Sequence, residues 1–163
     1  MLVKLVDPEC YGKDVHRILA HEGFAPSLLG TAEVPGAPTA IVMEYLDPSS
    51  GWMTLHSYLK KRQRIEVNTK HPELVKLLKT MKEKEVVHGD LRPNNIMCRL
   101  RPDKGAEADE LEFKVVDFDW AGKLKVAKYP AIMNSQIPWP GDPGASIGEG
   151  DDETLLTKTL KMV

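Results

Sequence analysis

The feature of this sequence that most limits its fold is a pair of short apolar stretches, each next to a polar loop. The loop His88–Asn95 leads directly into Ile96-Met97-Cys98, and Asp117 follows the apolar stretch Leu111–Val116. The polar segment 101–110 joins the two stretches, so they are predicted to form two short strands with a long exposed hairpin loop. Because antiparallel strands bring the start of one beside the end of the other, we expect the polar loop to lie next to Asp117.

The side chains that this hairpin gathers are those that phosphoryl transfer requires. Asp90 is the candidate to orient or deprotonate an attacking hydroxyl. Asn95, five residues further on, offers an amide oxygen to Mg²⁺, and Asp117 offers a charged oxygen, which a hard cation prefers. Arg92 is placed to neutralise charge on the transferred phosphate. The sequence therefore predicts a catalytic group around Asp90 and a metal site made by Asn95 and Asp117.

These motifs carry a resemblance to a known superfamily. The first loop fits the pattern H-x-D-x-x-x-x-N, and Asp117-Phe118 resembles the start of the metal-binding D-F-G sequence of protein kinases. The chain therefore resembles the protein-kinase-like superfamily. Its His-Gly-Asp form, with Asp119 in place of the glycine, is similar to aminoglycoside and choline kinases and to fungal kinase-like domains. The resemblance implies ATP and Mg²⁺ as cofactors. It also implies that His88, counted with the catalytic group, orients the loop and packs near Phe118.

The resemblance extends to a lysine near the start of the chain. Leu2–Val6 reads as a short strand in which Lys4 lies between apolar neighbours. It resembles the superfamily strand whose lysine contacts the nucleotide phosphates and is steadied by a helix carboxylate. Lys4 is accordingly expected to contact phosphate. Glu9 and Asp14 are both candidates for its partner, and Asp14 lies on the more regular helical stretch.

A second nucleotide contact is predicted at Met43-Glu44-Tyr45-Leu46, which resembles the hinge between kinase lobes. The resemblance implies that the adenine edge bonds to backbone groups near Glu44 and Leu46. Met43 would line the back of the pocket. These three residues complete the predicted nucleotide site with Lys4.

The fold class predicted from the sequence is α+β, a protein-kinase-like two-lobed fold with both lobes incomplete. Residues 1–163 are taken as a single domain, with 1–46 as a partial small lobe and hinge and 52–163 as a partial large lobe. The turn-forming segment 47–51 separates them. Apolar periodicity predicts strands at 28–32 and 39–45 and helices within 15–22, 55–62 and 72–81.

The chain departs from the superfamily pattern at both ends. No glycine-rich phosphate loop precedes Lys4, so weakened nucleotide affinity is expected. The segment 129–150 is rich in proline and glycine and lacks periodicity. Asp151 to Leu160 resembles only the start of the apolar helix that supports the catalytic loop. Apolar surface of the large lobe would then lack cover. Either a partner chain supplies that cover, or the sequence is a fragment of a longer protein or a degenerate relative of the superfamily.

Charge and cysteine usage exclude other classes. The net charge of −2 gives no global attraction to nucleic acid or to an anionic membrane, and the basic run 60–64 reads as a solvated helix end. Cys10 and Cys98 lie in no zinc-binding pattern. The sequence shows neither a signal-peptide core nor an apolar run of membrane-spanning length. A cytoplasmic or nuclear location is the default expectation.

The leading function is therefore transfer of the terminal phosphoryl group of ATP to a hydroxyl acceptor, with a protein as the favoured acceptor. A small-molecule phosphotransferase remains an alternative, because His88-Gly89-Asp90 is shared with that branch. A non-catalytic pseudokinase or interaction module is the rival from a different class, motivated by the shortened fold. A hydrolase is disfavoured. The segment 144–148 (Gly-Ala-Ser-Ile-Gly) matches the letters of the G-x-S-x-G nucleophile motif, but it lies in the proline- and glycine-rich stretch and no strand pattern leads into it.

Overall fold

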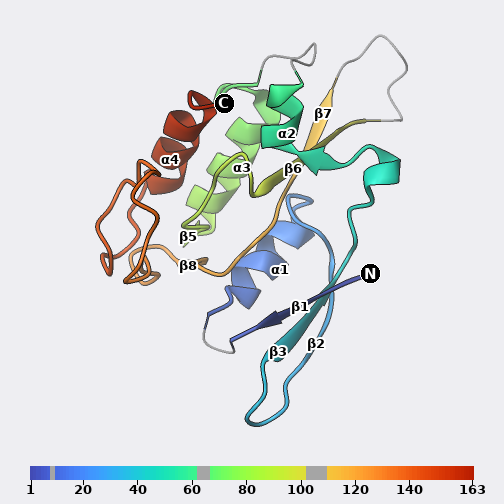
Figure 1. Cartoon of the computed structure of the whole chain (residues 1–163), viewed down its shortest axis with the longest axis vertical. Helices are drawn as coiled ribbons and strands as arrows, with labels where there is room; N and C mark the ends of the chain where they lie inside the picture. The colour runs from blue at the N-terminus through green and yellow to red at the C-terminus, as the bar shows by residue number, and fades with distance from the viewer. Residues whose placement is uncertain (8–9, 62–66, 102–109) are drawn as a thin grey trace.

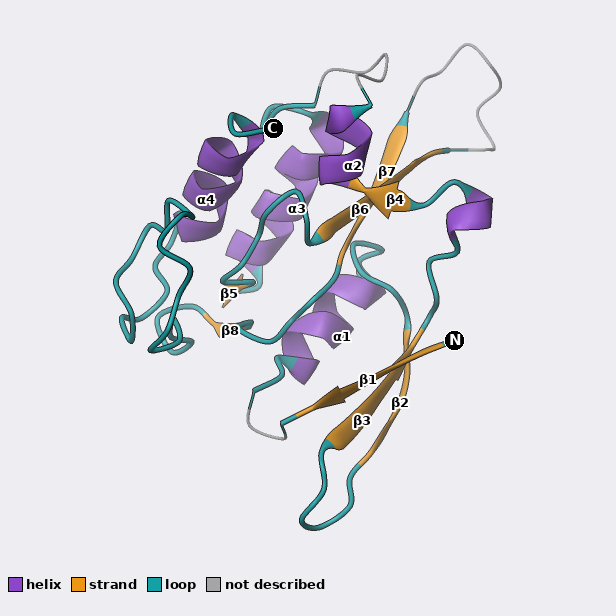
Figure 2. Cartoon of the chain, viewed as in Figure 1, coloured by secondary structure: helices purple, strands orange, loops and turns teal. Residues whose placement is uncertain are grey.

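The chain folds into a mixed α+β structure, as predicted from the sequence (Figures 1 and 2). A computed structural model describes residues 1–7, 10–61, 67–101 and 110–163. The elements in chain order are β1 (Leu2–Val6), α1 (Lys13–His21), β2 (Leu28–Ala32), β3 (Thr39–Met43), the short 3₁₀ helix η1 (Pro48–Ser50), β4 (Met53–Thr54), α2 (Leu55–Lys60), α3 (Pro72–Glu83), β5 (Val86–Val87), β6 (Ile96–Leu100), β7 (Leu111–Val115), β8 (Gly122–Lys123) and α4 (Asp151–Leu160).

The first sheet has the strand order β1-β3-β2, and both pairs are antiparallel. In β3 every second residue is buried, which is the alternation expected of a strand with one covered face. Ile41 and Met43 form a small apolar cluster with Val6. Helix α1 buries Val15, His16 and Leu19 on one face, and it lies between this sheet and the rest of the molecule (Figure 2).

The second sheet has the order β4-β6-β7 and contains the hairpin predicted from the sequence. Strands β6 and β7 are antiparallel, with Ile96 opposite Val115 and Leu100 opposite Leu111. The connecting loop falls mainly at 102–109, outside the described residues. Helices α2, α3 and α4 gather at the same end of the molecule as this sheet (Figure 1). Their apolar faces share one large core with α1, β6 and β7.

A third, two-stranded sheet ties the residues just before the His88–Asn95 loop to the segment that follows Asp117. Val86 in β5 pairs with Lys123 in β8, and Val87 pairs with Gly122. From Leu124 to Gly150 the described chain forms no helix or strand longer than an isolated bridge between Lys128 and Ser146. This irregular segment was predicted from its proline and glycine content.

Several element boundaries differ from the sequence-based expectation. The strand predicted to reach residue 45 ends at Met43, and the helix predicted to reach residue 62 ends at Lys60, with residue 62 outside the described residues. The two-residue strands β4, β5 and β8 were not predicted. Lys60 and Lys61 are exposed, as expected for a solvated helix end. None of the described helices combines the length and apolar character that crossing a bilayer requires.

Candidate active site

The His88–Asn95 loop begins with a turn that only glycine accommodates. Gly89 has φ of 81°, in the left-handed region. A Cβ atom there would lie 2.7 Å from Ile147 Cδ1 and 3.0 Å from Trp120 Cβ. Both the backbone conformation and the lack of space therefore exclude a side chain, which explains the glycine between His88 and Asp90.

The carboxylate of Asp90 is held by two neighbours from the same loop. Arg92 donates to both of its oxygens, from Nε to Oδ1 and from Nη2 to Oδ2 at 2.7 Å. Asn95 Nδ2 donates to Oδ2 at 2.9 Å and to the Asp90 carbonyl at 3.0 Å. The structure thus brings Asp90, Arg92 and Asn95 into direct contact. Asp90 is buried, with only 8% of its surface exposed.

His88 makes positioning contacts with both ring nitrogens. Its Nε2 lies 3.1 Å from the Val116 carbonyl, and its Nδ1 accepts from the Asp90 N–H at 3.3 Å. The His88 ring packs edge-on against Phe118, with 5.3 Å between ring centroids. The ring of His16, from α1, stacks on Phe118 with 4.5 Å between centroids. Because both nitrogens of His88 are engaged, the geometry supports an orienting role for this residue.

His16, which stacks on Phe118, also belongs to a short chain of hydrogen bonds within the N-terminal part of the fold. The Tyr11 hydroxyl donates to His16 Nδ1 at 2.7 Å, and His16 Nε2 donates to the Pro26 carbonyl at 2.8 Å. Burial lowers the pKa of His16. A neutral imidazole therefore bridges Tyr11 and Pro26 while it covers Phe118.

The hairpin places Asn95 beside the Asp117 loop. The Val116 N–H donates to the Asn95 carbonyl at 2.9 Å, so the two loops touch at the residue before Asp117. Asp117 itself has φ of 70°, which is unusual for a residue with a side chain and is typical of functional loops. Its side chain is 45% exposed.

Lys4 bridges the two aspartates of this loop. Its Nζ lies 2.5 Å from Asp117 Oδ1 and 2.6 Å from Asp119 Oδ1. Burial acts to lower the Lys4 pKa, but the hydrogen bonds and charges of Asp117 and Asp119 outweigh it and raise the pKa above its ordinary value. Lys4 therefore remains an ammonium ion at neutral pH.

The helix carboxylate expected to steady Lys4 is not found among the described residues. Asp14 lies in the first turn of α1 with its side chain 87% exposed, and it pairs with Arg17 instead. Glu9, the other candidate, lies outside the described residues. Of the two candidates that the sequence left open, Asp14 is therefore not the partner of Lys4, because its side chain is exposed to solvent and pairs with Arg17.

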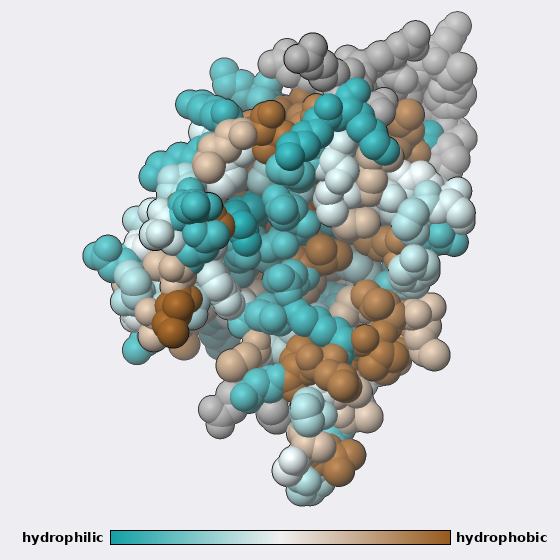
Figure 3. All heavy atoms as spheres, viewed as in Figure 1, coloured by the Kyte–Doolittle hydropathy of each residue, from teal (hydrophilic) through white to brown (hydrophobic). Residues whose placement is uncertain are grey.

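One pocket collects the residues predicted to bind the nucleotide. It has a volume of about 380 Å³, and its wall includes Lys4, Met43, Glu44, Leu46 and Asp117. Leu2, Val3 and Tyr45 complete much of its apolar surface. Figure 3 shows hydrophobic side chains gathered on the surface that lies over β1 and β3. Such a pocket, mostly apolar with three charged residues in its wall, suits a flat aromatic ring joined to phosphates.

One predicted hinge contact already has a partner within the protein. The Glu44 N–H donates to the Ser27 carbonyl at 2.9 Å. The Glu44 carboxylate accepts from the Ser27 N–H at 3.1 Å and from Lys114 Nζ at 2.9 Å. These bonds fix the hinge backbone, and they leave the N–H of Glu44 occupied before any ligand binds.

The donor chemistry at the loops fits Mg²⁺. Asn95 uses its Nδ2 group on Asp90, and no protein donor reaches its Oδ1 within the described part of the chain. That amide oxygen and the carboxylate of Asp117 are hard oxygen ligands from adjoining loops. No group of three or more His, Cys, Asp or Glu side chains suited to a metal occurs among the described residues. A cation here would thus take its remaining ligands from phosphate and water, which is usual for Mg²⁺.

Asp152, near the start of α4, binds the backbone at the start of the His88–Asn95 loop, and the sequence did not predict this contact. Its Oδ2 accepts from the His88 N–H at 2.8 Å, and its Oδ1 accepts from the Gly89 N–H at 2.9 Å. These contacts agree with the expectation that the final helix supports the loop. The sequence signal was the Asp151-Asp152 pair at the helix start, but no local pattern connects it to residues more than sixty positions earlier.

The buried carboxylate of Asp152 makes stability depend on pH. Burial raises the Asp152 pKa, although the charge of His88 and the two N–H donors act to lower it. At pH values above the ordinary aspartate pKa, the Asp152 carboxyl of the folded protein keeps its proton more readily than the same group in the unfolded chain does. The free energy of unfolding contributed by Asp152 must therefore fall as the pH rises from the ordinary aspartate pKa through the raised one.

This pH dependence is testable with Asp152→Asn, which does not titrate. Denaturant unfolding of both proteins at a series of pH values should show the wild type losing stability relative to the variant as the pH rises. The limiting slope is about 1.4 kcal/mol per pH unit within the titration window. The raised pKa would be contradicted if the difference in free energy of unfolding between the wild type and Asp152→Asn stayed constant with pH, or grew in favour of the wild type as the pH rose.

Trp139, from the irregular segment, stacks on the catalytic loop and was also missed. The Arg92 guanidinium lies 5.3 Å from the Trp139 ring centroid. Trp139 in turn packs against Trp120 at 5.0 Å and Tyr129 at 6.3 Å, and its indole N–H donates to the Asn134 carbonyl at 2.8 Å. The aromatic group therefore helps to hold Arg92 on Asp90.

Replacing Trp139 with alanine should lower the free energy of unfolding by about 1–2 kcal/mol, because the cation–π contact and the aromatic packing are both lost. Trp139→Phe, which keeps a ring face for Arg92, should recover most of that loss. Urea denaturation followed by circular dichroism measures both variants. Equal stability of Trp139→Ala and the wild type would show that the stacking is not stabilising.

Comparisons with known proteins define the fold and no more. No protein-family model matches the chain, and no curated protein sequence matches it. Among solved structures it is similar to the Cydia pomonella granulovirus kinase PK-1, with a TM-score of 0.52 and 16% sequence identity. The match covers 81% of this chain and 48% of PK-1, so the chain spans about half the length of that structure. The chain therefore has a protein-kinase-like fold.

Proposed function

We propose that this protein binds ATP with Mg²⁺ and transfers the terminal phosphoryl group to a hydroxyl acceptor, with a protein as the favoured acceptor. The observation that carries the proposal is one pocket whose wall holds Lys4, Met43, Glu44 and Leu46 together with Asp117. Asp90 and Asn95 lie in the adjoining loop, joined by a 2.9 Å hydrogen bond. The division into a small lobe (1–46) and a large lobe (52–163) is part of the same proposal.

Each residue has a defined task in this mechanism. Met43 and Leu46 exclude water from the base, and Lys4 attracts the phosphates while it remains charged. Asn95 and Asp117 would hold Mg²⁺, which neutralises phosphate charge and orients the terminal group when bound. Asp90 accepts the acceptor's hydroxyl hydrogen, and Arg92 lies beside it to stabilise charge on the transferred group.

Three ion pairs must rearrange before this mechanism operates. Arg92 occupies both oxygens of Asp90, and Lys4 joins Asp117 to Asp119. A nucleotide phosphate can draw Lys4 and Arg92 away, because it offers each cation a stronger, multiply charged partner. The same ion pairs favour the second candidate function, a pseudokinase in which the two aspartates stay closed and no transfer occurs.

Thermal unfolding with and without ligand tests the binding part of the proposal. Millimolar ATP with Mg²⁺ should raise the melting temperature, because a ligand that binds only the folded state stabilises it. Lys4→Met should reduce the shift, and Lys70→Met, at an exposed position far along the chain, should not. Absence of a shift at millimolar nucleotide would rule out the binding site. A shift without turnover of ATP would support the pseudokinase instead.

A further inference from the structure

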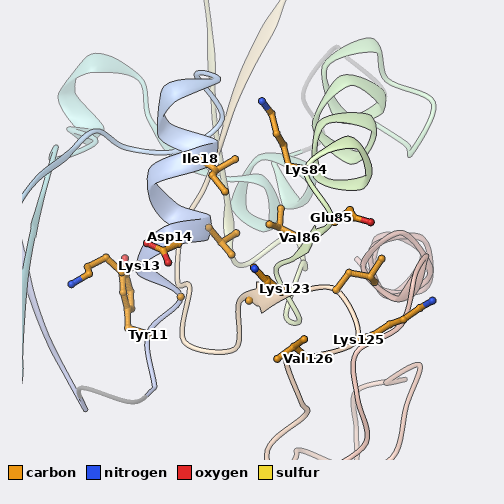
Figure 4. A pocket seen from close by; sticks show the side chains of 14 residues that line it. Tyr11, Lys13, Asp14, Ile18, Lys84, Glu85, Val86, Lys123, Lys125 and Val126 are labelled. Atoms are coloured by element: carbon orange, nitrogen blue, oxygen red, sulfur yellow. The ribbon is translucent and has the colours of Figure 1, made fainter.

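A second cleft shares no lining residue with the nucleotide pocket. Its volume is about 560 Å³. Three segments form it: the start of α1 from Tyr11 to Ile18, the chain from Lys84 to Val86, and the strand and loop from Gly122 to Val126 (Figure 4). None of the functions assigned above uses this cleft.

The cleft has an apolar centre and a basic edge. Ile18 and Val86 lie toward the middle in Figure 4, with Lys123 beside Val86 and Val126 at the lower side, while the side chains of Lys13, Lys84 and Lys125 extend outward. Four lysines line the cleft against two carboxylates: Lys13, Lys84, Lys123 and Lys125, with Asp14 and Glu85. The edge is therefore locally positive on a chain whose net charge is −2.

Two of the lysines are available to a ligand. Lys13 pairs with Glu33 at 3.1 Å and Lys84 pairs with Glu22 at 3.1 Å. Lys123 and Lys125 form no ion pair with any described residue, and both are exposed. Val126, which follows Lys125, is 68% exposed and offers an apolar contact next to these two lysines.

The combination identifies the kind of partner. We propose that this cleft docks a peptide segment of a partner protein that carries apolar side chains for the centre and aspartate or glutamate side chains for Lys123 and Lys125. A small polyanion would leave the apolar centre uncovered. This chain's own acidic segment, 149–153, is a poor occupant from a second copy, because Glu149 pairs with Lys82 and Asp152 is buried.

The start of α1 connects this cleft to the loop that carries Asp117 and Asp119. The Gly12 N–H donates to the Phe118 carbonyl at 2.8 Å, and a Cβ atom on Gly12 would lie 2.4 Å from the Ala121 carbonyl oxygen. The start of α1 is thus pressed against the loop that carries Asp117 and Asp119. A peptide that binds α1 and residues 122–126 together would fix the position of that loop.

A peptide-display selection on the immobilised full chain tests the proposal without reference to ATP turnover. Selected peptides should contain both acidic and apolar residues. Their binding, measured by calorimetry with the synthesised peptide, should weaken about tenfold or more for Lys123→Glu/Lys125→Glu, because charge reversal at a rim repels the acidic residues. Val126→Asp, at an exposed position that folding does not require, should weaken binding similarly. Lys70→Glu/Lys158→Glu reverses two exposed lysines elsewhere and should leave binding unchanged.

Three results would overturn the proposal. The first is a selection in which no peptide depends on Lys123, Lys125 or Val126, or in which the enriched peptides are basic. The second is that inorganic tripolyphosphate displaces the peptide and that apolar residues in the peptide add no affinity, which would make the cleft an anion site. The third is a dimer in sedimentation velocity that Val126→Asp abolishes, which would assign the cleft to a second copy.

Discussion

Replacing Asp90 with asparagine is expected to lower the rate of phosphoryl transfer by about 10²- to 10⁴-fold, the usual contribution of a positioned proton acceptor. The carboxylate lies in a buried loop where Arg92 and Asn95 fix its direction. An asparagine has nearly the same shape but cannot accept the hydroxyl proton, and it loses the ionic contact with Arg92. Release of ADP or transfer of labelled phosphate measures the effect.

A matched control separates this loss from a general effect of removing a carboxylate. Asp14→Asn makes the same chemical change at a side chain that is 87% exposed and pairs only with Arg17 among the described residues. It should leave turnover unchanged, and it also tests whether Asp14 serves Lys4 in any way. Equal turnover in Asp90→Asn and the wild type would remove Asp90 from the mechanism.

Replacing Asp152 with alanine should have the largest effect on stability. The substitution leaves the N–H groups of His88 and Gly89 without acceptors in the interior. Each buried donor without a partner costs about 1–3 kcal/mol, so the free energy of unfolding should fall by about 2–5 kcal/mol. The catalytic loop would also lose its support, so turnover should decline even at temperatures where the variant remains folded.

Urea denaturation followed by tryptophan fluorescence measures this change, because Trp120 and Trp139 lie beside the same loop. Glu153→Ala is the control, since this exposed neighbour in the first turn of α4 should cost only a few tenths of a kcal/mol. If Asp152→Ala were as stable as Glu153→Ala, the two hydrogen bonds would not support the loop.

The sequence predicted those elements whose signals are local. The strand ranges Leu2–Val6 and Leu28–Ala32 were predicted correctly, because turn-forming residues bound both of them. Helix α3 follows from its apolar spacing. Strands β4, β5 and β8 have two residues each and exist only because distant segments pair with them, so no local pattern marks them. The expected strand to residue 45 ends at Met43 because Glu44 bonds to Ser27 and Lys114 instead.

The contacts of the candidate site also fall into those that follow from neighbours in sequence and those that depend on distant segments. Contacts within the loop, such as Asp90 with Arg92 and Asn95, depend on neighbours in sequence and could be expected from the motif. The hairpin β6–β7 carries Asn95 to Val116, as its pattern predicted. The Lys4 contacts with Asp117 and Asp119 span more than a hundred residues, and no local pattern predicted them.

The contacts of Trp139 and Asp152 with the loop were not predicted either, because they depend on the packing of the irregular segment and of α4. Both residues act on the loop from outside its own sequence. Tertiary packing, rather than a motif, therefore fixes how firmly Asp90 and Arg92 are held.

Nuclear magnetic resonance of the labelled protein with Mn²⁺ and a non-hydrolysable ATP analogue shows directly whether a metal-bound nucleotide lies between the two loops. A paramagnetic ion broadens resonances of nuclei close to it, so Mn²⁺ at the proposed site should broaden the Asn95 side-chain amide and the backbone amides of Val116 and Asp117. Resonances of α4 beyond Asp152 should stay sharp. Broadening centred on another acidic region, or none at saturating nucleotide, would contradict a metal-bound nucleotide between these two loops.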